Sequence, residues 1–103
     1  LEKATNRHPA VLESAAIGVP SEIGEEDVKI FVRLRPGAHV APEDLLRHLE
    51  DHVPYFAVPR YVEFIDDFPK TPTERIRKHL LKEQPITAST WDREQAGYVL
   101  RRS

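Results

Sequence analysis

The chain has 103 residues, of which 40% are hydrophobic and 31% are charged, which is typical of one small soluble domain with a modest core. No apolar run approaches the roughly 20 residues of a membrane-spanning helix, and the formal net charge of −2 argues against general nucleic-acid binding. Cysteine is absent, which excludes disulfides and cysteine-based metal sites and fits a cytoplasmic location.

The beginning of the sequence suggests part of a longer protein. Methionine is absent even at position 1, and residues 1–8 are typical of a helix end that Pro9 closes. We therefore expect further chain before Leu1. The first residues also lack the apolar stretch of a signal peptide.

The first half of the chain predicts two strands and a helix. "VLESAAIGVP" (11–20) is typical of a strand, and "VKIFVRLR" (28–35) alternates in hydrophobicity with a period of two, which predicts a half-buried strand. The connection between them is short enough for an antiparallel pair. "APEDLLRHLEDHV" (41–53) predicts a helix, since Pro42 suits the first helical position and its leucines form an apolar stripe.

The second half predicts a third strand at 60–66, a loop at 69–73, and a helix at 74–82 capped by Thr73. A further short helix is expected in "STWDREQAGY", where Ser89 and Asp92 have the spacing of a capping box. We expect a domain over residues 1–84 and a tail with a short helix over residues 85–103. The predicted fold is α+β, a small three-stranded sheet with helices packed on it.

Positive charge is concentrated in "DDFPKTPTERIRKHLLK" (66–82). One interpretation is an ordinary solvated helix face, which is common and usually has no function. The other is an anion-binding loop, in which Thr71, Thr73 and free backbone amides contact a phosphate or carboxylate while Lys70 and Arg75 add full charges. Composition alone leaves both interpretations open.

Other kinds of site find little support. His48 and His52 have the i, i+4 spacing of a metal-binding pair, but no third ligand lies at a suitable spacing, so we expect an exposed pair and no metal. The sequence has no G-x-S-x-G motif, no cysteine nucleophile and no glycine-rich phosphate loop.

Several dispersed motifs occur in an order that resembles a known family. They lie in the runs "HPAVLESAAIGVPSEIGEEDVKIFVRLRPG" and "PEDLLRHLEDHVPYFAVPRYVEFIDDFPKTPTERIRK". Over roughly residues 1–82 the chain resembles the C-terminal domain of the adenylate-forming (AMP-binding) enzymes. Its details, including the tail, look most like acyl-CoA synthetases of the crotonobetaine/carnitine-CoA ligase type.

The resemblance implies part of an acid-thiol ligase. In such enzymes a carboxylate and ATP give an acyl-adenylate and pyrophosphate, and coenzyme A then displaces AMP. A large N-terminal domain binds ATP with Mg²⁺ and the acyl group, while the small C-terminal domain is a mobile lid, so the isolated lid should be inactive. The implied setting is fatty acid metabolism in the cytoplasm. The alternative is a non-catalytic, degenerate lid-like domain that binds another protein.

The family pattern P-K-T-x-x-G-K ends in a catalytic lysine, but here Glu74 replaces the glycine and Arg75 replaces that lysine. Arginine keeps the charge but is bulkier and cannot be acetylated like the family lysine. Arg75 is the expected first-step cation. Lys70 or Lys78 could substitute, or adenylation could be weak.

The resemblance also implies ligand contacts outside the catalytic position. Thr71 and Thr73 would lie on the phosphate side. Coenzyme A contacts would come from Gly18, Val19 and Pro20 with the neighbouring acidic turn at 21–27.

Overall fold

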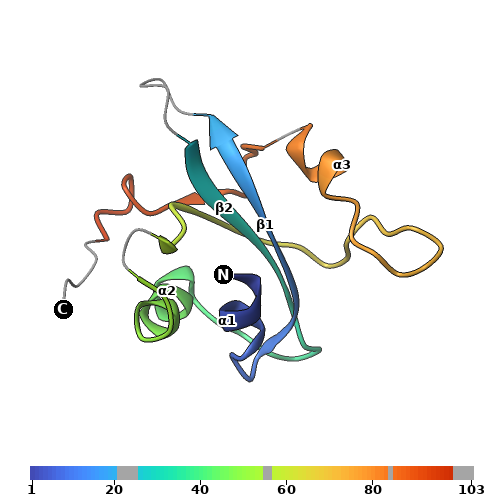
Figure 1. Cartoon of the computed structure of the whole chain (residues 1–103). Coiled ribbons are helices and arrows are strands. Elements are labelled where there is room, and N and C mark those ends of the chain that lie inside the picture. Colours follow the sequence, from blue (N-terminus) through green and yellow to red (C-terminus); the bar gives the residue numbers. More distant parts are fainter. Residues whose placement is uncertain (21–25, 55–56, 84, 99–103) are drawn as a thin grey trace.

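The computed structural model describes residues 1–20, 26–54, 57–83 and 85–98. In these residues four strands form one mixed sheet, in the order β1-β2-β3-β4 (Figure 1). β1 is antiparallel to β2, β2 is parallel to β3, and β3 is antiparallel to β4. Their bounds are Val11–Pro20 for β1, Glu26–Leu34 for β2, Tyr61–Phe64 for β3 and Trp91–Asp92 for β4. The α+β class is therefore confirmed, with one strand more than expected.

Helices α1 (Glu2–Asn6) and α2 (Pro42–Glu50) lie on one side of the sheet, and α3 (Lys78–Lys82) lies on the other (Figure 1). The polar side chains of α1 cover the outer edge of β1, where Glu2 Oε2 accepts a hydrogen bond from the Ala16 amide at 2.8 Å. None of the helices in the described residues is long and apolar enough to cross a membrane.

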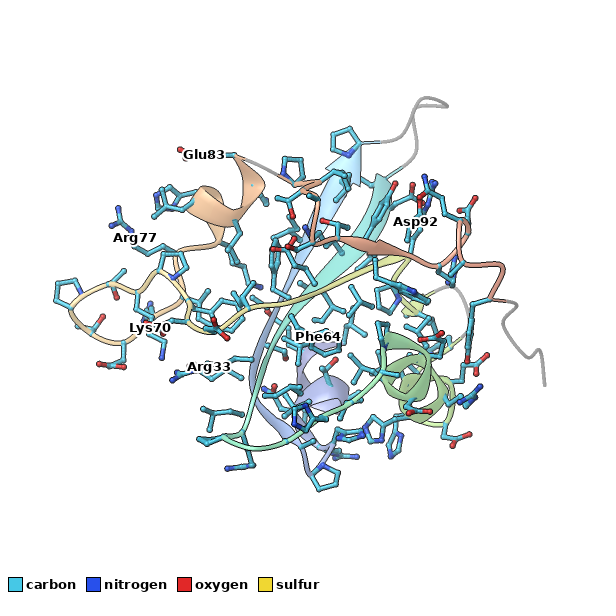
Figure 2. The ribbon with its side chains drawn as sticks, turned by 180° about the vertical axis from the view of Figure 1, so that it is seen from behind. Arg33, Phe64, Lys70, Arg77, Glu83 and Asp92 are labelled. Carbon is cyan, nitrogen blue, oxygen red and sulfur yellow. The ribbon has the colours of Figure 1, made fainter. Side chains whose placement is uncertain are left out.

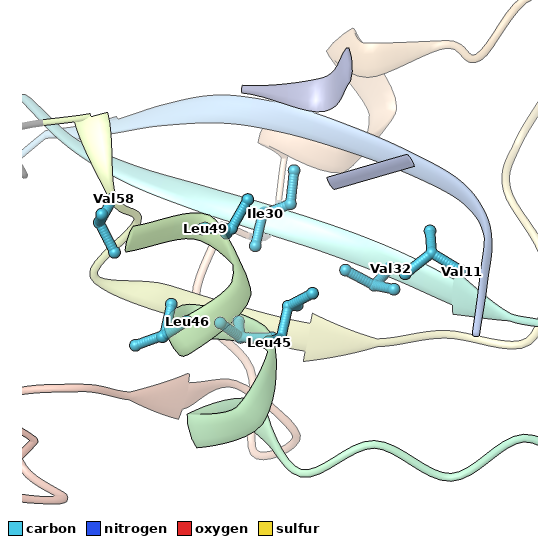
Figure 3. Packing of buried hydrophobic residues seen from close by; sticks show 8 residues of the cluster. Val11, Ile30, Val32, Leu45, Leu46, Leu49 and Val58 are labelled. Carbon is cyan, nitrogen blue, oxygen red and sulfur yellow. The ribbon is translucent and has the colours of Figure 1, made fainter. Parts of the chain in front are cut away.

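Two hydrophobic clusters fill the two faces of the sheet. The larger cluster joins Ile30 and Val32 of β2 to the three buried leucines of α2, as the sequence predicted (Figure 3). The smaller cluster lies on the opposite face and contains Phe31 of β2 and Phe68 of the segment after β3. Because that segment and α3 cover the second face, β2 is buried on both faces, and the prediction of a half-buried strand is wrong.

The tail does not form the helix expected between Ser89 and Tyr98. Trp91 and Asp92 instead pair with Val62 and Tyr61 as β4, and a turn follows over residues 93–97. Asp92 Oδ1 accepts a hydrogen bond from the Glu94 amide at 2.9 Å, so the side chain that would have belonged to a capping box stabilises a turn. The division of the chain between residues 84 and 85 stays a prediction.

The predicted helix at 74–82 is also shorter than expected. Lys70 and Ile76 form an antiparallel bridge, and the Arg77 amide donates to the Pro69 carbonyl at 2.7 Å. These bonds fold residues 69–77 into a hairpin, so α3 begins only at Lys78. Thr73 lies in this hairpin and does not cap the helix.

Candidate functional site

Residues 69–77, here called the cation loop, project away from the body of the molecule (Figure 1). The Thr71 amide donates to the Arg75 carbonyl at 2.8 Å, and the Glu74 amide donates to the Thr71 carbonyl at 2.9 Å. These two bonds close a tight turn at the tip of the loop. Arg75 is therefore presented on a short, hydrogen-bonded hairpin and not on a helix face.

The backbone of this turn explains why the family pattern has glycine at the position of Glu74. Glu74 has a φ of 66°, in the left-handed region that glycine adopts without a steric penalty. The position where the pattern has glycine is thus a position where the chain needs a positive φ. Glu74 keeps the turn but places a carboxylate beside Arg75.

Thr71 and Thr73 contact each other at the tip. Their Oγ1 atoms lie 3.0 Å apart, and Thr71 Oγ1 also accepts a hydrogen bond from the Arg75 amide at 3.1 Å. Thr71 therefore shapes the turn, while Thr73 is exposed on it. Both threonines thus lie beside Arg75 on the hairpin, and not at the helix start that the sequence predicted; their contact with a phosphate stays a prediction.

The three candidate cations differ in their surroundings. The Lys70 ammonium lies 2.6 Å from Glu13 Oε1, and this hydrogen bond is the main cause of its raised pKa. The Lys78 ammonium lies 2.8 Å from Glu2 Oε2. The Arg75 side chain is exposed, and within the described part of the chain it has no ion-pair partner. Of the three, Arg75 is the cation that is available to an external anion.

Glu13 organises the base of the cation loop, which sequence reasoning missed. Its second oxygen, Oε2, lies 2.9 Å from Arg33 Nη1, so the carboxylate binds two cations at once. The hydrogen bond from Lys70, with help from Arg33, outweighs the effect of burial and lowers the pKa of Glu13. Figure 2 shows Lys70 and Arg33 near the base of the loop.

A second polar cluster lies under the tail and was also missed. Lys29 is fully buried, and its ammonium contacts Glu63 Oε1 at 2.7 Å, the Pro85 carbonyl at 2.6 Å and Thr90 Oγ1 at 2.8 Å. Glu63 also borders a cavity of about 470 Å³ between the sheet and α3. The signal for this cluster was Lys29, which stands two residues before Phe31 and therefore on the same face of β2, because a charge on a buried face needs a buried partner.

The residues expected to contact coenzyme A lie away from the cation loop. Gly18, Val19 and Pro20 form the end of β1, five residues or more beyond Glu13, roughly 16 Å along the strand. The Val19 side chain is buried, and the Glu26 carboxylate occupies the space beside Gly18. Residues 21–25 of the acidic turn lie outside the described residues. The coenzyme A contacts stay a prediction.

The histidine pair on α2 is joined by a third histidine. The ring centroid of His48 is 4.3 Å from that of His52 and 5.1 Å from that of His8. His48 Nε2 also lies 2.9 Å from the Ala4 carbonyl oxygen. Within the described residues, no group of three or more metal-ligating side chains could hold an ion.

Comparisons with known proteins agree with this arrangement. A model of the family described as the AMP-binding enzyme C-terminal domain matches residues 1–75. The chain is 38% identical over 92 residues to a long-chain-fatty-acid–CoA ligase of Yersinia pestis, a match covering 89% of this chain and 16% of that protein.

Two similar solved structures each contain this fold as a small part. The acyl-CoA synthetase of Brucella canis superimposes with a TM-score of 0.74 at 40% identity, covering 80% of this chain and 16% of that one. ATP-bound MatB of Rhodopseudomonas palustris gives a TM-score of 0.74 at 33% identity, again covering 80% of this chain and 16% of that one. The chain thus spans about a sixth of the length of these proteins.

Proposed function

Because the chain belongs to the AMP-binding enzyme C-terminal domain family, we propose that it is the mobile lid domain of an ATP-dependent acyl-CoA synthetase. In the first step a carboxylate oxygen of the substrate bonds to the α-phosphorus of ATP, and pyrophosphate leaves. In the second step the thiol sulfur of coenzyme A bonds to the acyl carbon, and AMP leaves with the electron pair of the broken C–O bond. The partner of the lid is its own N-terminal domain.

The observation that carries this proposal is the exposure of the Arg75 guanidinium, which has no ion-pair partner in the described part of the chain. The first step brings two anions together, so a cation placed between them lowers the barrier electrostatically. The Arg75 guanidinium is exposed at the tip of the cation loop, whereas Lys70 and Lys78 are each paired with a glutamate. Thr73 is exposed beside that charge and its hydroxyl can donate a hydrogen bond, whereas the amides of Thr71, Glu74 and Arg75 already donate within the turn. We therefore assign the first-step cation to Arg75.

The N-terminal domain would supply most of the remaining site. We propose that it binds ATP, Mg²⁺ and the acyl group, and that the lid contributes contacts to coenzyme A near Gly18, Val19 and Pro20. The proposed subclass is the crotonobetaine/carnitine-CoA ligase type, acting in fatty acid metabolism in the cytoplasm. Thioester formation with a panel of carboxylic acids tests this subclass.

The Arg75→Ala variant tests the assignment in the polypeptide that joins this chain to its N-terminal domain. We expect pyrophosphate exchange into ATP to fall by about 10²- to 10³-fold, since a placed electrostatic donor is lost. Thioester formation from supplied acyl-adenylate should stay near its original rate. Arg75→Lys should restore much of the exchange, because it returns the charge.

Arg77→Ala is the matched control, since it removes the same kind of group from an exposed residue at the base of the loop. It should reduce exchange by a few-fold at most, because a solvent-exposed charge acts only weakly at a distance. Normal exchange in Arg75→Ala would show that Arg75 is not the first-step cation, whereas an absence of exchange in the unsubstituted polypeptide would favour the non-catalytic alternative.

A further inference from the structure

Glu13 lies at an irregular point of β1. The register of β1 against β2 shifts between Val11, which is opposite Leu34, and Glu13, which is opposite Arg33. A bulge of this kind changes the direction of a side chain relative to a regular strand. Here the redirected side chain is a carboxylate that contacts the cation loop.

The two oxygens of Glu13 have separate partners. Oε1 lies 2.6 Å from Lys70 Nζ, and Oε2 lies 2.9 Å from Arg33 Nη1. The side chains of Glu13 and Lys70 are 23% and 22% exposed, so water screens this pair less than the Lys78–Glu2 pair, whose side chains are 44% and 35% exposed. Glu13 therefore forms the better shielded link between the sheet and the basic segment.

Lys70 occupies the base of the hairpin that carries Arg75. It forms the bridge with Ile76, and Ile76 in turn follows Arg75 directly. The other attachments of the loop base are the packing of Ile76 against the smaller hydrophobic cluster and the bond from the Arg77 amide to the Pro69 carbonyl. The Glu13–Lys70 contact is the ion pair that ties this base to β1.

We propose that Glu13 is a positioning residue for adenylation, acting through Lys70 to fix the cation loop; this inference rests on the proposed function. A misplacement of about 1 Å in a reacting group can reduce a rate by about 10²-fold. Without the Glu13 carboxylate, Lys70 is released, the loop base moves, and a second cation competes with Arg75 for the phosphates. The first step then slows although Arg75 itself is unchanged.

The test uses Glu13→Gln in the chain joined to its N-terminal domain. We expect the kcat of pyrophosphate exchange to fall by about 10- to 100-fold, with little change in the KM for ATP. Thioester formation from supplied acyl-adenylate should be unaffected. Glu94→Gln is the matched control, because Glu94 also pairs with an arginine of another element, Arg60, at 3.2 Å, and should leave both half-reactions unchanged.

A double-mutant cycle with Lys70→Gln separates positioning from general damage. If Glu13 acts through Lys70, Glu13→Gln should have little further effect in the Lys70→Gln background. Glu13→Asp, which keeps the charge but shortens its reach, should lose less exchange than Glu13→Gln. Unfolding curves of each variant identify any that fail to fold, and Glu13→Asp then serves as the test variant.

Three results would overturn the inference: normal exchange in Glu13→Gln, an equal loss in both half-reactions, or additive effects in the cycle. Failure of the proposed function gives a different result, namely no pyrophosphate exchange in the unsubstituted polypeptide. A loss in Arg75→Ala with none in Glu13→Gln would overturn the role of Glu13 alone.

Discussion

At the scale of single residues, the tip of the cation loop combines a strained backbone with opposed charges. A non-glycine residue in the left-handed region costs about 1–2 kcal/mol, and Glu74 adopts it with a φ of 66°. Glu74 Oε2 lies 3.7 Å from Lys70 Nζ, so its carboxylate also interacts with the lysine at the loop base. Glu74 therefore carries two effects, a backbone penalty and a negative charge next to the proposed catalytic cation.

Two substitutions separate these effects. Glu74→Gly should raise the free energy of unfolding by about 1 kcal/mol or less, because relief of strain is partly offset by the greater entropy of the unfolded chain. It should also raise pyrophosphate exchange a few-fold, since the carboxylate beside Arg75 is removed. Glu74→Gln should raise exchange without the gain in stability. Urea unfolding and exchange assays measure both quantities, and slower exchange in both variants would mean that the carboxylate assists the reaction.

At the scale of elements, β4 is held by side chains more than by its strand pairing. A strand of two residues makes few ladder bonds, but two charged clusters flank it. In the first, Lys29 directs all three of its N–H groups to acceptors, which is the pattern of a charged ammonium. In the second, Arg60 binds Asp27 and Asp92, each at 3.1 Å. These clusters explain why residues 85–92 lie against the sheet.

Removal of the buried cation tests this account. Lys29→Met should lower the free energy of unfolding of the chain by about 3–5 kcal/mol, because it leaves the Glu63 carboxylate buried without its ion-pair partner. The double variant Lys29→Met/Glu63→Gln should recover part of this loss. Lys82→Met, at an exposed lysine of α3, should change stability by no more than about 0.5 kcal/mol.

Urea unfolding measures these free energies, and hydrogen exchange of the amides at 90–92 shows whether the tail is released first. If Lys29→Met folds but proves too unstable for an unfolding curve, Thr87→Val is the milder variant: it removes the hydrogen bond to Glu63 and the one accepted from the Ser89 amide, at about 1 kcal/mol each. A Lys29→Met variant as stable as the original chain would contradict the account.

At the scale of the whole molecule, local patterns predicted most of the fold. The leucine stripe of α2 and the alternation of β2 depend on neighbouring residues, and both elements occur where expected. The burial of Lys29 and the pairing of Trp91–Asp92 depend on contacts between distant parts of the chain. Propensity and periodicity carry no information about those contacts. The capping-box spacing of Ser89 and Asp92 therefore predicts a helix, whereas the structure has a strand there.

The candidate site likewise contains residues that a local pattern identifies and residues that only the folded structure identifies. Arg75, Thr71 and Thr73 could be named from one short motif, because the chemistry and the turn lie in consecutive residues. Glu13 could not, since its contact with Lys70 depends on the folding of the segment after β3 back toward β1. A sequence motif therefore identifies the proposed cation, and the structure is needed to identify the residue proposed to position it.

Ion pairs spread over the whole molecule also predict how its stability responds to acid. The pKa values of Glu13, Glu63 and Asp92 all lie below their ordinary values. For Glu13 the largest cause is the hydrogen bond from Lys70. For Glu63 and Asp92 burial is the largest single effect and raises the pKa, but the hydrogen bonds and charges around Lys29 and Arg60 together outweigh it. In the unfolded chain these carboxyl groups return to ordinary values of 4.5 for glutamate and 3.8 for aspartate. As the pH falls through that range, the unfolded state binds more protons than the folded state, so stability decreases.

We therefore expect the contribution of these carboxylates to be complete at and above about pH 6 and to be lost progressively as the pH falls below about 4.5 toward the lowered native pKa values. Urea unfolding of the chain at a series of pH values measures this dependence. Glu63→Gln should flatten the curve, because one of the linked groups no longer titrates. A stability that rises on acidification would mean that burial, and not the ion pairs, determines the protonation of these carboxylates.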